Sequence, residues 1–192
     1  KIVIELKRDA NAQLVLNQLY TYTQLQDTVG VIMLALVNGE PKTLTLRQML
    51  EEYIKFQEQI ITRRTIFDLK KAKERAHILE GLVIALDYID EVISIIRSHY
   101  TSQEGKEVLM ERFGLDDIQA QAIIQMPLGR LAGMEREKLK AETDELHEKI
   151  AEYNAILADE KRVRAIVKQE LLEIKEKFND PRRTEIASVE GE

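Results

Sequence analysis

Apolar residues recur at alternating steps of three and four through two long stretches of this 192-residue chain. The first stretch carries Ala72, Ala76, Leu79, Val83, Leu86, Ile89, Ile93 and Ile96. The second starts at Leu139, and nine of its twelve seam positions as far as Phe178 are apolar. Such a repeat is the a/d seam of a coiled coil, which restricts the chain to long helices. Two seams separated by an insert predict an antiparallel helical hairpin.

The two seams are predicted to lie on helices over residues 45–100 and 137–178. The first segment contains no proline, and Gly81 is its only glycine. A helix of that length extends about 80 Å. Because this exceeds the diameter of a compact domain of similar size, we expect the helix to project. In the second segment the polar seam positions Thr143, Glu160 and Arg164 either fix the register or mark a bend.

The insert, residues 101–136, has a different composition that is typical of short helices. Thr101 to Glu104 form a capping box that opens one helix, and Gly114 closes it. Asp116 or Asp117 caps the next helix, and Pro127 interrupts the pattern after it. We therefore predict a small helical tip at the end of the hairpin.

The tip carries apolar residues on more than one face, and a thin two-helix arm offers little neighbouring structure to bury them. An exposed apolar cluster of this kind predicts a partner surface, most simply the same tip of a second chain. The candidate dimerisation residues are Ile118, Ala122, Ile123, Met126, Leu128 and Leu131.

The two ends of the chain do not share the coiled-coil pattern. Residues 1–44 carry strand signals, with apolar alternation over residues 2–7 and a branched apolar run over residues 31–37 that Asn38-Gly39 turns. A short helix with Ala12, Val15, Leu16 and Leu19 on one face is expected between them. At the other end Pro181 stops the helix, and residues 179–192 are expected to form an exposed linker toward a further domain. The predicted fold is mainly α, a coiled-coil hairpin with a helical dimerisation tip and a small β-containing segment of two to four strands.

Composition and motifs favour no catalytic role for these residues. The chain has no cysteine, and its three histidines share no metal-ligand spacing. Glycine-rich phosphate loops and a serine nucleophile elbow are missing from the sequence. None of the six tyrosines has an adjacent Arg or Lys that could activate it. We therefore predict no catalytic residue, no metal site and no cofactor in this chain. No apolar run is long enough to cross a membrane.

One stretch of the first helix is locally basic although the chain has a net charge of −6. Between Lys55 and Arg75, seven basic residues face three acidic ones, a local net charge of +4. The candidate contacts to DNA phosphates are Lys55, Arg63, Arg64, Lys70 and Lys71. The alternative is a solvated coiled-coil flank stabilised by i,i+4 ion pairs such as Lys70 with Glu74.

Several long strings in this sequence resemble one protein family. RRTIFDLKKAKERAHILEGLVIALDYIDEVISIIR (63–97) and DDIQAQAIIQMPLGRLAGMEREKL (116–139) are similar to the arm and gate of the A subunits of bacterial type IIA DNA topoisomerases. TQLQ (23–26) resembles the end of the tower domain of that family, and RRTEI (182–186) resembles the start of its connection to a DNA-wrapping domain. The ending and the arm favour the gyrase branch over the topoisomerase IV branch.

The resemblance implies a place for each segment in a larger enzyme. Residues 1–44 would be the end of the tower, 45–100 the outgoing arm helix, 101–136 the exit gate (C-gate), 137–178 the return helix and 179–192 the linker. Enzymes of this family cut one duplex with paired tyrosines and pass a second duplex through the break. They use ATP and Mg on other domains. The implied partners are a second copy, double-stranded DNA and the topoisomerase B subunit, in a bacterial cytoplasm and nucleoid.

The resemblance also has limits that bear on activity. The catalytic tyrosine of the family follows an arginine, and no Arg-Tyr pair occurs here, so the segment alone is predicted to be inactive. Gln125 and Pro127 stand where the family usually has Asp and Arg, which affects the expected gate geometry. From composition and heptads alone, a non-enzymatic coiled-coil adaptor remains the alternative.

Overall fold

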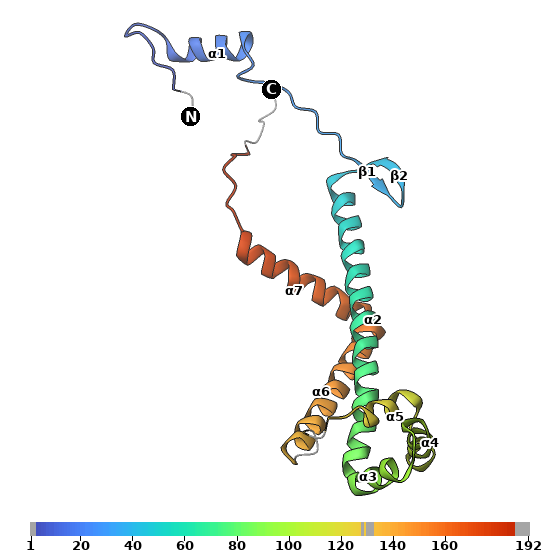
Figure 1. Ribbon diagram of the computed structural model, residues 1–192. Helices are drawn as coiled ribbons and strands as arrows, with labels where there is room; N and C mark the ends of the chain where they lie inside the picture. The colour runs from blue at the N-terminus through green and yellow to red at the C-terminus, as the bar shows by residue number, and fades with distance from the viewer. Residues whose placement is uncertain (1–2, 128, 130–132, 187–192) are drawn as a thin grey trace. The chain divides into compact units, whose positions relative to one another are not determined.

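The computed structural model describes residues 3–127, 129 and 133–186, and the fold within them is mainly helical, as predicted (Figure 1). The chain divides into two compact units, Lys1–Glu52 and Tyr53–Glu192. The first unit contains helix α1 (Ala12–Tyr22), strands β1 (Leu34–Val37) and β2 (Glu40–Thr43) and the first turns of the long helix α2 (Leu46–Asp87).

The small sheet is a single two-stranded antiparallel hairpin. Val37 is opposite Glu40, and the two turn residues Asn38 and Gly39 have φ values of 53° and 83°. Two consecutive left-handed residues make a type I′ turn, so the predicted Asn-Gly turn is confirmed. The strand expected over residues 2–7 is wrong for residues 3–7, which form no strand. Alternation alone cannot form a strand without a hydrogen-bonding edge to pair with.

The predicted short helix near the N-terminus is confirmed as α1. Asn11 caps it, because its side-chain oxygen accepts hydrogen bonds from the backbone N–H groups of Gln13 and Leu14. No residue of α1 is buried. Leu34 and Leu36 of the hairpin are exposed as well, so the first unit leaves apolar side chains uncovered.

The expected first arm helix is divided into two helices, α2 (Leu46–Asp87) and α3 (Ile89–Ser98). Tyr88 separates them with φ −120° and ψ 38°, and its ring packs against Phe113 with centroids 5.6 Å apart. Beyond the break, α3 directs Val92 into a core where it is only 2% exposed. The apolar repeat in the sequence continues through Tyr88. The helix does not, because the residues of α3 pack against the other helices of the tip.

The tip begins and ends its helices at the predicted caps. Helix α4 (Ser102–Phe113) is capped by Thr101, which accepts from the Glu104 N–H at 3.2 Å, and it ends at Gly114 with φ 65°. Helix α5 (Asp117–Ile124) is capped by Asp116, which forms a reciprocal capping box with Gln119. The sequence left Asp116 and Asp117 as alternatives, and the structure selects Asp116.

The return helix is divided at Asp159 into α6 (Gly133–Ala158) and α7 (Glu160–Phe178). The polar seam positions indicated a possible bend, and the helix does break next to one of them, Glu160. Glu160 and Arg164 are exposed, whereas Val163 is buried. The uninterrupted heptad count is wrong at Arg164, because the structure buries Val163 there, whereas Val167 keeps its predicted place in the seam.

Helices α2 and α6 form the predicted antiparallel hairpin (Figure 1). Ion pairs join Arg136 to Asp87 and His147 to Glu80, so residue numbers rise along α6 as they fall along α2. At the far end, Ile156 of α6 and Val163 and Val167 of α7 form a small cluster with Ile61 of α2.

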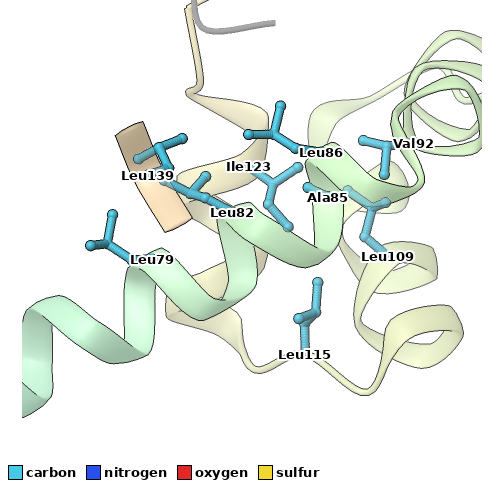
Figure 2. Close-up of a cluster of buried hydrophobic side chains, with 9 residues drawn as sticks. All are labelled: Leu79, Leu82, Ala85, Leu86, Val92, Leu109, Leu115, Ile123 and Leu139. Carbon is cyan, nitrogen blue, oxygen red and sulfur yellow. The ribbon is translucent and has the colours of Figure 1, made fainter. Parts of the chain in front are cut away.

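The main core lies where α2 meets the tip. Figure 2 shows its nine buried residues, contributed by α2 to α6 and by the loop before α5. They are Leu79, Leu82, Ala85, Leu86, Val92, Leu109, Leu115, Ile123 and Leu139. The tip thus buries a larger share of its apolar side chains than a thin arm was expected to allow.

Candidate dimerisation tip and basic flank

The predicted gate residues lie at different depths in the tip. Ile123 is 3% exposed and belongs to the core, Ala122 and Met126 are half-buried, and Ile118 is 58% exposed on the first turn of α5. Leu128 and Leu131 lie outside the described residues. Among the described residues of the predicted set, Ile118 is the most exposed, and Ala122 and Met126 are also partly accessible to a partner without unfolding the tip.

An apolar groove of about 280 Å³ runs between α3 and the end of α5. Its walls include Met126 and Ile124 on one side and Ile93 and Ile96 on the other, and Arg97 is the one charged residue among those that line it. The α3 residues were predicted from the heptad repeat, but as part of the arm. Their role as a groove wall depends on the break at Tyr88, which the repeat does not contain.

Close helix packing holds α5 on α2. A Cβ built on Gly81 would lie 2.8 Å from the Cβ of Gln119, so only glycine allows this approach without a shift. The Gln119 side-chain amide donates to the carbonyl oxygen of His77 at 2.8 Å. These contacts fix the groove wall that α5 contributes.

A polar contact anchors the start of the same helix. The Asp116 carboxylate lies 2.5 Å from His77 Nε2 and also accepts from the backbone N–H of Gln119 at 2.9 Å. The Gln119 N–H and, next, the His77 ring hold the pKa of the Asp116 carboxyl below its usual range. Neighbouring Asp117 pairs at 2.6 Å with the ammonium of Lys106, whose side chain is almost buried.

The basic flank of α2 combines ion pairs with exposed cations. Arg64 pairs with Glu170, a hydrogen bond that raises the pKa of the guanidinium. Lys70 and Lys71 share Glu74 at 3.9 and 3.7 Å, so the predicted i,i+4 pair is present, but both contacts are long and exposed. The alternative reading as a coiled-coil flank is therefore partly correct.

An exposed face of α2 nevertheless carries several of these cations together. Arg63, Phe67, Lys70 and Lys71 are all exposed at helical spacing, and the Lys71 ammonium lies 5.8 Å from the centre of the Phe67 ring. Lys55 and Arg63 also line the groove where α7 crosses α2, together with Glu58 and Glu160. The charge of that groove is mixed, whereas the Arg63 face is predominantly basic.

The described residues offer no arrangement typical of a metal site. Within residues 3–127, 129 and 133–186, no group of three or more histidine or carboxylate side chains could hold a metal ion. No catalytic step is assigned to these residues. No helix in the same part of the chain is long and apolar enough to cross a membrane.

Comparison with known proteins gives a consistent result over the whole chain. The family described as the A subunit of DNA gyrase/topoisomerase IV matches residues 1–172. The chain is 58% identical over 192 residues to the A subunit of DNA gyrase from Clostridium acetobutylicum, covering 100% of this chain and 23% of that protein. It is 55% identical over 190 residues to the same protein of Halalkalibacterium halodurans, covering 99% and 23%. For Staphylococcus aureus the identity is 52% over 186 residues, covering 97% and 21%.

Proposed function

Because the chain belongs to the family of DNA gyrase and topoisomerase IV A subunits, we propose that it is the coiled-coil arm and exit-gate segment of a gyrase-type protein. It spans about a quarter of the length of the relatives that it matches. In the whole protein it would support ATP-dependent passage of one DNA duplex through another, with the cutting tyrosine, ATP and Mg elsewhere. This segment alone would be inactive.

The apolar groove between α3 and α5 is the observation that carries the proposal. A second copy of the tip is the simplest partner for it, because one chain then presents both the groove and exposed apolar side chains such as Ile118. A gate must also open. A small apolar contact with few charges separates more readily than a large obligate interface.

The basic face of α2 supports a second part of the same proposal. Arg63, Lys70 and Lys71 would contact phosphates of a duplex without reading its sequence. Arg64 would add a contact when its pair with Glu170 opens, and Lys55 is the remaining candidate. The B subunit would bind other parts of the protein. The relatives named above are gyrase subunits, which favours gyrase over topoisomerase IV; the equivalent topoisomerase IV segment is the alternative.

Sedimentation equilibrium tests the gate. The chain is expected to dimerise reversibly at tens of micromolar, and Ile118→Asp or Met126→Glu is expected to weaken the dimer at least about tenfold. Ile123 is unsuitable for this purpose, because a charge at a core position would unfold the tip. Ile66→Asp on α2 is the matched control, since Ile66 is 52% exposed and lies outside the tip.

The control variant should dimerise like the parent chain. A monomeric parent chain at these concentrations would contradict the proposal. Dimers that survive both tip substitutions would do the same, because they would place the interface elsewhere.

A further inference from the structure

Helix α7 separates its charged side chains onto different faces. The helix carries six basic and four acidic residues, so composition alone indicates a surface of mixed charge. At about 100° per residue, however, Lys161, Lys168 and Lys175 fall within an arc of about 40°. Every acidic residue of the helix lies outside this arc: Glu160, Glu170, Glu173 and Glu176. We call the three lysines the lysine row.

The lysine row is straight and evenly spaced. Its members are seven residues apart, which on an α-helix places neighbouring Cα atoms about 10.5 Å apart and the outer two about 21 Å apart. The helix has no glycine or proline that would bend it. Val163 and Val167 are buried on another face, about 120° from the row, so all three lysines remain exposed. The helix thus presents a rigid line of positive charge.

The chain itself does not neutralise the lysine row. Among residues 3–127, 129 and 133–186, none of its three ammonium groups has an ion-pair or hydrogen-bond partner. Other surface lysines do have one, as Lys149 does in Glu145 at 2.6 Å on α6. A neutral surface that covered the row would bury unpaired charge, which is strongly unfavourable. Whatever contacts the row in a longer protein or a complex must therefore be anionic.

We propose that the lysine row binds the phosphate backbone of double-stranded DNA, as a contact site separate from the basic face of α2. The inference rests on the proposed role of the chain in duplex passage. A duplex carries about one charge per 1.7 Å of its axis, so a straight row of cations can meet phosphates in many positions along it. Because lysine contacts phosphates as a point charge, the row holds a duplex without reading its sequence and allows it to slide.

An acidic protein segment is the other anionic partner that a row of lysines could take. Recognition of carboxylates favours arginine, whose planar fork pairs with both carboxylate oxygens. Arg164, the arginine beside the row, is already paired with Glu58 at 2.7 Å. The row consists of lysines, and this favours the phosphates of a duplex over a carboxylate partner.

The lysine row lies next to the basic flank of α2 but does not overlap with it. Arg63 and Arg164 line the groove where α7 crosses α2, whereas no lysine of the row lines it. Substitution of the row therefore leaves the contacts at the crossing, such as the pair of Arg164 with Glu58, in place. The two basic surfaces can thus be tested independently.

Fluorescence anisotropy of a labelled duplex across a salt series tests the row in the 192-residue chain. The row triple changes Lys161, Lys168 and Lys175 to Gln. It is expected to reduce the slope of log affinity against log salt by about three, roughly one for each lost phosphate contact. Circular dichroism checks that α7 stays helical, which is expected because Gln has nearly the helix propensity of Lys.

The control triple changes Arg162, Lys177 and Arg182 to Gln. Arg162 and Lys177 lie on α7 outside the arc, and Arg182 follows the helix. This triple alters the net charge by the same amount as the row triple but leaves the row intact. Its salt slope should stay close to that of the parent chain.

Three results would overturn the proposal. Equal losses from the two triples would show that net charge explains the binding. Absence of duplex binding by the parent chain at low salt would leave the row without its ligand. The third result is poly-glutamate that binds the parent chain more tightly than the duplex does and loses this binding in the row triple, because the row would then take an acidic protein segment.

Two further measurements separate this site from the rest of the proposed function. The row triple is expected to dimerise like the parent chain in sedimentation, because the row lies outside the tip. A monomeric parent chain that still shows the effect of the row triple would reject the gate and leave this site standing. In a chain with Arg63, Lys70 and Lys71 already changed to Gln, the row triple should reduce the slope by about three again. Loss of the effect in that background would overturn the row as a separate site.

Discussion

Gly81 shows how one atom can decide whether α5 rests on α2. In Gly81→Ala the new Cβ would meet Gln119 at 2.8 Å, and Gln119 would have to leave the His77 carbonyl and its half of the capping box. We expect a net loss of about 1–2 kcal/mol, the overpacking cost reduced by the better helix propensity of alanine. Urea unfolding followed by circular dichroism measures it.

Gly105→Ala is the matched control, because a Cβ there meets only the Ile96 Cα at an ordinary 3.8 Å. It should stabilise α4 by about 0.5–1 kcal/mol through helix propensity alone. The two substitutions are thus expected to have opposite signs. Equal effects at both glycines would mean that the α2–α5 contact is not tight.

Asp116 makes stability depend on pH in a predictable direction. Its pKa is lowered in the folded chain, first by the Gln119 N–H and then by His77, so its contribution is complete above the unfolded pKa and is lost as pH falls through the folded value. Asp116→Asn keeps a helix cap but removes the charge. We expect the variant to melt at a lower temperature than the parent at pH 7, and the difference to shrink below about pH 4. A pH-independent difference would contradict this origin.

At the scale of elements, local signals predicted the ends of helices better than their continuity. The caps at Thr101 and Asp116 and the turn at Gly39 form where the sequence indicated, because each depends on residues only a few positions apart. The breaks at Tyr88 and Asp159 interrupt patterns that run on in the sequence. At Tyr88 the break comes with packing of its ring on Phe113 and of Val92 in the core, and so the groove wall on α3 could not be predicted although its apolar residues could.

The seam of α7 tests whether the helix break or the continuous heptad pattern decides which residue is buried. Strict heptad counting places Arg164 in the seam, whereas the structure buries Val163 against Ile61. Val163→Ala is expected to destabilise the chain by about 2 kcal/mol through lost burial. Arg164→Ala, which removes an exposed pair with Glu58, is expected to leave the unfolding midpoint nearly unchanged. Chemical denaturation of both variants decides which residue occupies the seam, and the reverse order of effects would support the uninterrupted heptad.

For the whole molecule, physical patterns and family strings contributed different parts of the prediction. Spacing indicated a hairpin with a partner-seeking tip, and the structure has α2 and α6 antiparallel with a groove at the tip. Spacing alone could not connect that tip to DNA passage. That part of the proposal rests on the resemblance of the long strings around residues 63–97 and 116–139 to the family, and the match over residues 1–172 confirms the family. Most of the length of the relatives lies outside this chain, so chemistry could not be predicted from it.

Whole-molecule charge gives the last prediction, because a chain with a net charge of −6 can bind DNA only through a local basic face. We expect weak, sequence-independent duplex binding that falls steeply with salt, measured by fluorescence anisotropy. Neutralising Arg63, Lys70 and Lys71 together to Gln should reduce the slope of log affinity against log salt by about three, roughly one for each lost phosphate contact.

A second triple substitution distinguishes DNA binding by the local basic face of α2 from binding that depends only on the net charge of the chain. Lys138, Lys140 and Lys149 of α6 are exposed, and changing them to Gln alters the net charge by the same amount as the α2 triple. If the face on α2 binds the phosphates, the α6 triple leaves the salt slope close to that of the parent chain. Equal losses from the two triples would instead mean that net charge alone governs the interaction, and the phosphate role of α2 would be withdrawn. Neither triple includes a residue that lines the apolar groove through which the chain is proposed to dimerise. Lys138, Lys140 and Lys149 pair with Glu135, Asp87 and Glu145, so circular dichroism of both triples checks that each is folded before binding is compared.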